Sequence, residues 1–262
     1  MAEKMPHQTR TVIVTGASRG IGRATALRLA DDFDLVALVA RSEDALADCA
    51  SMIEQSGGKA LVLARDLRLP ENAAAVVAAV AGVTGRIDAV VNIAGAVPQA
   101  NLMALSDDEW DDGLSMKFHG ARRLALAAWP HLKQSNGALV FISGATAAVP
   151  SAALAAVSTV NAAIAALAKA FADQGLLDGV RVNSVLPGAV MTGRRLAMIA
   201  RYAEARGLTV EDALLHYSSE AGIARFGEPE EIAELIAFAV SPAAAWMTGT
   251  ALRMDGGETR AV

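Results

Sequence analysis

Residues 12–22 read VIVTGASRGIG, an apolar β-branched run followed by Gly16, Gly20 and Gly22. The next residues, RATALRLA at 23–30, have the apolar spacing of a helix. Glycine lets the chain turn sharply and lets its backbone approach a diphosphate, and the N-terminus of the next helix supplies free N–H groups and positive potential. An ordinary glycine-rich turn is the alternative reading. The order of strand, turn and helix favours a cradle for a dinucleotide.

Short apolar runs alternate with helical stretches along the chain, beginning with the run that opens this segment. They lie at 11–14, 35–40, 60–64, 89–94, 138–143 and 180–186. Their apolarity is continuous rather than alternating, which indicates that helices cover both faces of a mostly parallel sheet. We therefore expect an α/β fold, a single-domain doubly wound parallel sheet over residues 1–262. The Arg-rich stretch at about 191–226 shows no strand pattern and predicts an inserted lid or binding segment.

Composition excludes several functional classes. The 262 residues contain 23 Lys and Arg against 28 Asp and Glu, a net charge of −5, so we expect no nucleic-acid partner. The charge-free run at 134–168 is interrupted by Gly and Pro, which predicts a buried strand, loop and helix rather than a membrane span. Cys49 is the single cysteine and the segment at 2–10 is polar, so we expect a reducing, cytoplasmic location.

The glycine spacing in TGASRGIG resembles that of the short-chain dehydrogenase/reductase family. NIAG at 92–95 resembles the family's NNAG with the second Asn replaced, and PGAVMT at 187–192 resembles its PGxVxT. RFGEP at 225–229 and DGG at 255–257 match its C-terminal motifs, so the resemblance extends over almost the whole chain. It implies a Rossmann fold and hydride transfer between a nicotinamide dinucleotide and a small carbonyl or alcohol.

The resemblance also implies which residues bind the cofactor. The phosphates would lie on Gly16, Ser18, Arg19, Gly20, Ile21 and Gly22, the adenine on Asp66 and Leu67, the ribose on Asn92, Ala94 and Gly95, and the nicotinamide on Pro187, Gly188, Val190 and Thr192. No metal site is expected.

The end of the second strand decides between the two nicotinamide cofactors. An acidic residue there would accept hydrogen bonds from the 2′-OH of NAD(H). This chain has Arg41 instead, with Arg19 in the glycine turn. Two guanidiniums favour a 2′-phosphate, so we expect NADP(H) over NAD(H). The alternative is that Arg41 is only a solvated residue at the start of a helix.

The resemblance does not extend to the family's catalytic residues. The family's usual catalytic set is an Asn, a Ser and a Tyr-x-x-x-Lys, in which the Tyr protonates the substrate oxygen. In the family's register the Asn position holds Lys117, the Ser position Gly144, the Tyr position Val157 and the Lys position Asn161. Val157 has no proton to give. No tyrosine occurs between residues 1 and 201 that a change of register could bring to its place.

We consider three replacement candidates, Lys117, Ser143 and Asn161. The residues one turn from Lys117 are small or apolar, which predicts an inward lysine with a lowered pKa that could act as acid or base. The alternatives are that it extends to water or pairs with a distant carboxylate. Ser143 could replace the lost hydroxyl, although strand alternation turns it away from the direction of Gly144. Asn161 could orient a substrate or water, or simply pack its helix. Tyr217 is a further possible acid if the insertion covers the site.

Three functions remain open at this point. The chain could be an NADP(H)-dependent oxidoreductase with a non-standard proton donor, a nucleotide-binding pseudoenzyme, or a non-redox lyase or isomerase that reuses the pocket. In each case the expected ligand is a small molecule. The Ala-rich helix expected at 151–173 suits close helix pairing, and the family commonly pairs through it, so we also expect a homo-oligomer, a dimer or tetramer.

Overall fold

The computed structural model describes residues 9–260, so the ends of the expected 1–262 domain, residues 1–8 and 261–262, lie outside the described residues. The described chain forms one sheet in the order β3-β2-β1-β4-β5-β6-β7, with every neighbouring pair parallel. Its strands are β1 (Thr11–Thr15), β2 (Leu35–Ala40), β3 (Ala60–Ala64), β4 (Ala89–Asn92), β5 (Ala138–Ile142), β6 (Arg181–Pro187) and β7 (Ala251–Met254). This confirms the predicted doubly wound α/β fold.

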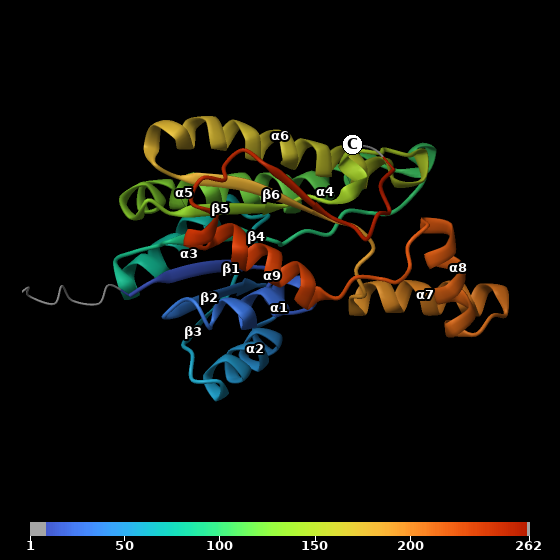
Figure 1. Ribbon diagram of the computed structural model, residues 1–262, viewed down its shortest axis with the longest axis horizontal. Helices are drawn as coiled ribbons and strands as arrows, with labels where there is room; N and C mark the ends of the chain where they lie inside the picture. The colour runs from blue at the N-terminus through green and yellow to red at the C-terminus, as the bar shows by residue number, and fades with distance from the viewer. Residues whose placement is uncertain (1–8, 261–262) are drawn as a thin grey trace, which may run out of the picture.

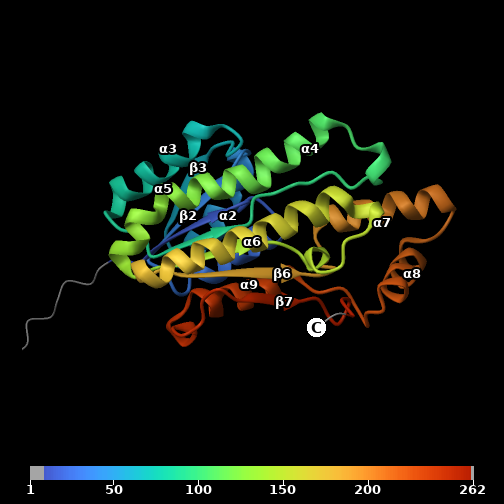
Figure 2. The same cartoon turned by 90° about the horizontal axis from the view of Figure 1, so that it is seen from above.

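Helices cover both faces of the sheet (Figures 1 and 2). One layer contains α1 (Gly20–Leu29), α2 (Glu43–Gln55) and α9 (Pro229–Val240), and the other contains α3 (Pro70–Thr84), α5 (Gly120–Ser135) and α6 (Ala155–Asp178). The short helix α4 (Asp107–Gly113) continues into α5 through a π-helical segment, Leu114–His119. Segments of π-helix inside α-helices are frequent at functional sites, so this segment is a candidate for one.

Two hydrophobic cores separate the sheet from its two helical layers. In β1, Val12 and Val14 belong to the core beneath α1, α2 and α9, while Ile13 belongs to the core beneath α3, α5 and α6. All three side chains are fully buried. Burying one such side chain stabilises the fold by about 1.5–3 kcal/mol. The continuous apolarity of the strand sequences therefore reflects a sheet that is covered on both sides.

Several helix starts follow from the local sequence. Ser106 and Glu109 form a reciprocal capping box at the start of α4, in which each side chain bonds the other residue's backbone N–H. Pro70 and Pro229 occupy the first turns of α3 and α9, where proline's missing N–H costs no helical hydrogen bond.

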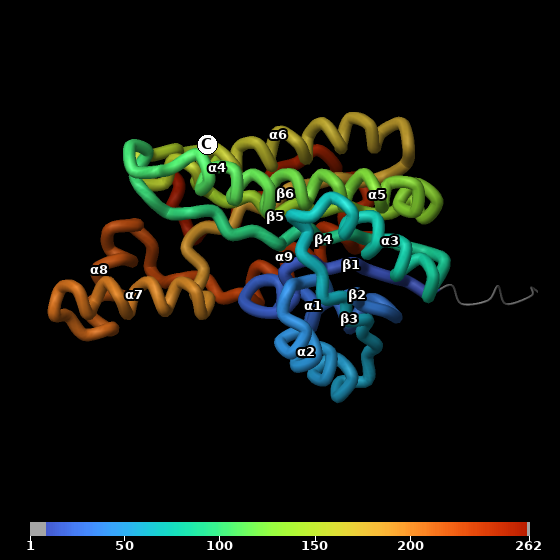
Figure 3. The backbone as a smooth tube through the Cα atoms, turned by 180° about the vertical axis from the view of Figure 1, so that it is seen from behind, coloured from blue at the N-terminus to red at the C-terminus, as the bar shows by residue number. Residues whose placement is uncertain are grey.

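Helices α7 (Gly193–Arg206) and α8 (Val210–Ala221) occupy most of the 191–226 segment. Figure 3 shows that they extend past the end of the sheet, after β6. The segment leaves and rejoins the body at a bridge between Val190 and Gly227, where Met191 N donates to Gly227 O at 2.7 Å. The two helices share a small hydrophobic core of their own, which includes Ile199 and Phe226.

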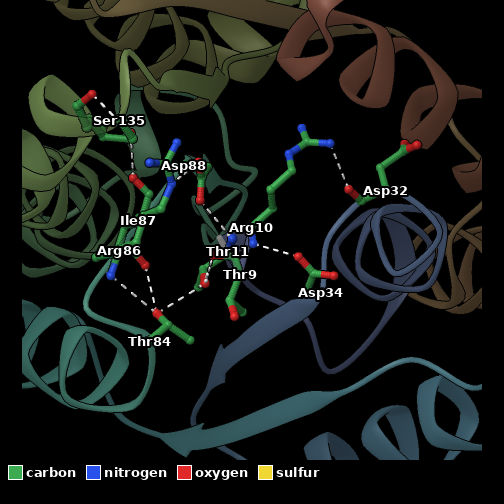
Figure 4. Close-up of polar contacts among 11 residues, drawn as sticks. Thr9, Arg10, Thr11, Asp32, Asp34, Thr84, Arg86, Ile87, Asp88 and Ser135 are labelled. Carbon is green, nitrogen blue, oxygen red and sulfur yellow. Dashed lines mark hydrogen bonds and ion pairs between the residues drawn. The ribbon is translucent and has the colours of Figure 1, made fainter. Parts of the chain in front are cut away.

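The amino ends of β1 and β4 are joined by polar contacts (Figure 4). The backbone N–H of Thr11 donates to Asp88 Oδ2 at 2.9 Å, and Arg86 Nε contacts Asp88 Oδ1 at 2.6 Å. Thr11 Oγ1 also donates to Thr84 Oγ1 at 3.1 Å. This network lies at the opposite end of the strands from the glycine turn, so its role is to fix the sheet rather than to bind the cofactor.

The stretch Ala152–Asp178, which includes α6, is long and apolar enough to cross a membrane when only length and composition are considered. In the fold, Ile164 and Ala168 of this helix lie in the core beneath α3, α5 and α6. Figure 2 shows the helix lying along β6. A core helix of a soluble protein has these same properties.

Candidate active site

The turn after β1 has a geometry that only glycine satisfies. Gly16 has φ +69° and Gly20 has φ +54°, values that side chains rarely adopt. A Cβ at Gly22 would overlap the carbonyl oxygen of Gly16, and a Cβ at Gly16 would lie 3.1 Å from Ala94 N. The glycines therefore allow the turn, the start of α1 and the loop after β4 to pack closely together.

This turn leaves the N-terminus of α1 open to an anion. Arg19 occupies the N-cap position without a side-chain hydrogen bond to the helix, and the first turn has no acidic residue. The free N–H groups there are suited to a phosphate. A Cβ on Gly20 would lie 3.3 Å from Thr192 Cγ2, so the structure brings the segment after β6 to the glycine turn.

Two more residues predicted to bind the cofactor, Asn92 and Asp66, lie at the carboxyl ends of their strands, as the glycine turn does. Asn92, at the end of β4, is buried, and its Oδ1 has no hydrogen-bond partner within the described chain. Such an orphaned acceptor fits a ligand hydroxyl. Asp66 follows β3, and its Oδ1 accepts from Arg68 N at 3.0 Å, which fixes the loop that carries Leu67. Thr15 Oγ1 accepts from the backbone N–H of Ala94 at 2.9 Å and anchors the loop after β4.

The two arginines predicted to select the cofactor are exposed. Arg41 directly follows β2, and Arg19 lies in the glycine turn. Within residues 9–260, neither guanidinium forms a hydrogen bond or an ion pair. Ser42, next to Arg41, caps α2 by accepting from Ala45 N at 3.4 Å. The chain thus presents two unengaged positive groups beside the phosphate cradle.

The three catalytic candidates meet at one place. Lys117 Nζ donates to the backbone carbonyl of Ser143 at 2.8 Å and to Oδ1 of Asn161. The hydroxyl of Ser143 donates to the backbone carbonyl of Asn161 at 2.7 Å. Nδ2 of Asn161 donates to Thr146 Oγ1 at 2.9 Å, a contact that the sequence analysis did not anticipate. Lys117 lies on the π-helical segment, Ser143 directly follows β5, and Asn161 lies on α6.

Burial changes the acidity of Lys117. Desolvation and, to a smaller extent, the charge of Arg194 lower the pKa of Lys117 from 10.5 to about 8. Neither hydrogen-bond acceptor of Lys117 is a carboxylate. Lys117 is therefore held by two uncharged acceptors and not by an ion pair with a distant carboxylate. An ammonium with this pKa can release and regain a proton near neutral pH.

The space around this cluster is shaped by two glycines. A Cβ on Gly95 would lie 2.8 Å from Cγ of Lys117, and a Cβ on Gly144 would overlap Nδ2 of Asn161. The backbone of Gly144 is extended, with φ 165°, so space rather than conformation requires glycine there. The Lys117 and Asn161 side chains fill the volume that larger residues at 95 and 144 would need.

An apolar wall adjoins the cluster. Val157, one helical turn before Asn161, packs with Val97, Val160 and Trp110 in a small hydrophobic core. The loop that carries Val97 contacts the inserted segment, because Arg194 Nη2 donates to Val97 O at 3.2 Å. Helix α7, which carries Arg194, therefore reaches the loop beside Lys117.

Tyr217 lies in a different environment from the cluster. Its ring packs 4.9 Å from the ring of Tyr202, in the core shared by α7 and α8. The ring of Tyr202 also stacks on His216, with 5.8 Å between centroids. These aromatic contacts hold α7 against α8.

The fold and the glycine turn define a dinucleotide-binding Rossmann protein. A family model described as enoyl-(acyl carrier protein) reductase matches residues 16–259. The short-chain reductase protein NovJ of Streptomyces niveus is 32% identical over 250 residues, which cover 95% of this chain and 94% of that protein. The 3-oxoacyl-(acyl-carrier-protein) reductase FabG of Staphylococcus aureus is 28% identical over 251 residues, covering 95% and 98%. This chain belongs to the short-chain dehydrogenase/reductase family.

Solved structures give the same result. L-sorbose reductase from Gluconobacter frateurii, in complex with NADPH and L-sorbose, superposes with a TM-score of 0.93 at 28% identity, covering 97% of this chain and 98% of that one. An actinorhodin polyketide ketoreductase with NADPH has a TM-score of 0.91 at 27% identity, covering 97% and 98%. The family predicted from the motifs is confirmed.

Proposed function

We propose that this protein is an NADP(H)-dependent oxidoreductase that interconverts a small carbonyl compound and its alcohol, with Lys117 as the proton donor. The observation that carries the proposal is the placement of Lys117 Nζ between the carbonyl of Ser143 and the amide of Asn161. An ammonium has three N–H donors, and these two acceptors leave one N–H for a substrate oxygen.

The cofactor is proposed from the cradle and its charges. The open N-terminus of α1 suits the diphosphate, and the orphaned Oδ1 of Asn92 suits a ribose hydroxyl. Arg41 and Arg19 suit the 2′-phosphate and favour NADP(H) over NAD(H). Relatives solved with NADPH support this assignment.

The chemistry follows from these positions. When bound, NADPH would supply the hydride that reduces the carbonyl carbon, so that negative charge would develop on the carbonyl oxygen. Lys117 donates its free N–H proton to that oxygen, which gives the alcohol and a neutral amine that water reprotonates. Ser143 and Asn161 keep the Nζ atom in place, and Val157 and Trp110 form an apolar wall against which a substrate chain can pack. A positioned acid contributes about 10²- to 10⁴-fold in rate.

The experiment compares the parent with Lys117→Met and with a control, Lys169→Met, an exposed lysine of α6 that contacts Asp173. NADPH binding is measured by fluorescence, and NADPH oxidation is followed with a carbonyl panel that includes L-sorbose and a 3-oxoacyl thioester. We expect Lys117→Met to bind NADPH normally and to lose about 10²- to 10⁴-fold in kcat. Lys169→Met keeps full activity.

Other outcomes identify the competing functions. Absence of NADPH binding contradicts the proposal. NADPH binding without turnover in the parent, with activity in a Lys117→Asn, Gly144→Ser, Val157→Tyr, Asn161→Lys variant, indicates a pseudoenzyme. Conversion of a substrate without consumption of NADPH indicates a lyase or isomerase.

The 191–226 segment is proposed as the substrate lid of this single-domain enzyme, with the Val190–Gly227 bridge at its base. The bond from Arg194 to Val97 O supports this, because it joins the segment to the loop beside Lys117.

A cytoplasmic location is also proposed, from the single cysteine.

A homo-oligomer is proposed through α5 and α6. Ala162 and Ala166 of α6 are small and exposed, and Leu126 of α5 is 51% exposed. Small residues allow two helices to approach closely. Light scattering should give a dimer or tetramer of the 27.0 kDa chain, and Ala166→Arg should reduce its mass. A monomeric mass for the parent would contradict this assignment.

A further inference from the structure

Thr146 lies in a 3₁₀ turn, Ala145–Ala147, that follows β5. Its side chain is partly exposed, whereas Ser143, three residues earlier, is buried. Thr146 is joined to Lys117 through a single group, the side-chain amide of Asn161. The side chains of Lys117, from the π-helical segment, and of Thr146, from the 3₁₀ turn, therefore bond the two ends of one amide.

The hydrogen-bond pattern fixes the direction of each bond. A protonated lysine can only donate, so Oδ1 of Asn161 faces Lys117 and Nδ2 faces Thr146. Thr146 Oγ1 consequently accepts from Asn161, and its own hydrogen remains available. Within residues 9–260, that hydrogen has no acceptor. Thr146 therefore has a hydroxyl proton to offer to a ligand.

The other positions after β5 do not offer such a donor. The Ser143 hydroxyl already donates to the backbone carbonyl of Asn161 at 2.7 Å. Gly144 has no side chain, and Asn161 occupies the space beside it. Between residues 143 and 147, Thr146 is the side chain with a free polar hydrogen.

We propose that Thr146 is a second catalytic residue, whose hydroxyl donates a hydrogen bond to the same substrate oxygen that Lys117 protonates. This inference rests on the proposed function. When hydride reaches the carbonyl carbon, negative charge develops on the oxygen, and the Lys117 N–H and the Thr146 O–H hold it from two directions. The proton that is transferred comes from Lys117, and Thr146 keeps its own. Donors positioned in this way act on the transition state more than on the bound substrate.

The test compares Thr146→Val, which keeps the shape and loses the hydroxyl, with Thr146→Ser, which keeps the hydroxyl. Loss of one such donor costs about 10²- to 10³-fold in kcat. We expect a loss of about 10²-fold for Thr146→Val and of less than about threefold for Thr146→Ser, with NADPH binding unchanged in both. Equal activities in the two variants would overturn the inference.

A second readout separates a donor from a support for Asn161. If Thr146 only positions Asn161, Thr146→Val displaces Lys117 and moves the inflection of the kcat against pH profile. If Thr146 contacts the substrate oxygen, kcat falls by the same factor across the profile and the inflection stays where it is in the parent. A moved inflection would overturn the assignment of Thr146 as a catalytic residue.

Binding of trifluoroethanol to the NADP⁺ complex gives a measurement that needs no turnover, because this acidic alcohol mimics the product oxygen. We expect Thr146→Val to weaken its binding about tenfold, the equivalent of about 1.4 kcal/mol, and Thr146→Ser to leave it unchanged. A parent that neither turns over carbonyls nor binds trifluoroethanol overturns the proposed function and this inference together. A parent that does both, with Thr146→Val equal to it, overturns this inference alone.

Discussion

Lys117 donates a hydrogen bond to the side-chain amide of Asn161, although 44 residues separate them in the sequence. The resemblance to the family predicts the amide at position 117 and the lysine at position 161, whereas this chain has Lys117 and Asn161. The two residues form a contact in this order. The cation and the amide therefore both lie beside the carboxyl end of β5, the cation on the π-helical segment and the amide on α6.

The rate of carbonyl reduction should depend on pH through Lys117. Its pKa is about 8, so the ammonium that donates the proton is lost above this pH. We expect kcat for reduction to fall above about pH 8 and kcat for alcohol oxidation, which needs the neutral amine, to rise through the same pH. Initial rates in both directions from pH 6 to 10 test this. The same inflection in Lys117→Met would show that another group titrates.

The free energy of unfolding should also depend on pH through Lys117. The pKa of Lys117 is lower in the folded chain, about 8, than its ordinary value of 10.5, so between these values the unfolded chain binds more protons. Stability attributable to this lysine therefore rises with pH from about 8 to 10.5 and is constant below 8. Each pKa unit corresponds to about 1.4 kcal/mol, and because solvent reaches part of the side chain we expect a gain of about 1–3 kcal/mol.

Urea unfolding of the parent and of Lys117→Met at pH 7, 8, 9 and 10 measures this gain. The parent should become more stable relative to Lys117→Met as the pH rises. Lys169→Met, which alters an exposed lysine, serves as the control and should follow the parent. Parallel curves for the parent and Lys117→Met would mean that Lys117 is not desolvated.

Placing a serine at position 144 should damage the site. A Cβ at Gly144 overlaps Nδ2 of Asn161, and Asn161 is held by Lys117, Thr146 and Ser143, so it has little freedom to move. Overpacking of this kind costs about 1–3 kcal/mol. We expect Gly144→Ser to lower the free energy of unfolding by about that amount.

A double-mutant cycle in urea unfolding tests the overlap with Asn161. Asn161→Ala removes the overlapping group, so the double variant should be destabilised by less than the sum of the single changes. Gly193→Ser is the matched control, because a Cβ at Gly193 meets nothing within 4 Å. Additive effects would mean that Gly144 and Asn161 do not compete for this space.

Sequence predicted the parts of the fold that are buried on both sides. The continuous apolar runs gave the strands up to β6, because each of them lies between two helical layers. It did not predict β7, whose four residues, Ala251–Met254, are short and mostly exposed at the sheet edge. It also did not predict α7 and α8 as helices, although Thr192 and Thr209 cap them in the usual way.

Prediction of the site reached a similar limit. Small neighbours at one-turn spacing indicated that Lys117 turns inward, because that spacing is a local property of a helix. The partner of Asn161 depends on how α6 packs against β5 and the π-helical segment, which no local pattern records. Thr146 was missed because a three-residue turn has no periodicity to mark it. Contacts between distant segments therefore required the structure.

Cofactor preference should change when Arg41 is removed. Arg41 is exposed beside the phosphate cradle and forms no hydrogen bond or ion pair within residues 9–260, so Arg41→Ala should leave the fold intact. A charge-assisted pair is worth about 1.5–3 kcal/mol, so we expect NADPH binding to weaken about 10- to 100-fold and NADH binding to change less than about threefold. Fluorescence titration with both cofactors measures this, and Lys59→Ala, at the opposite end of β3, controls for the loss of one positive charge. Equal weakening for NADH would show that Arg41 does not bind the 2′-phosphate.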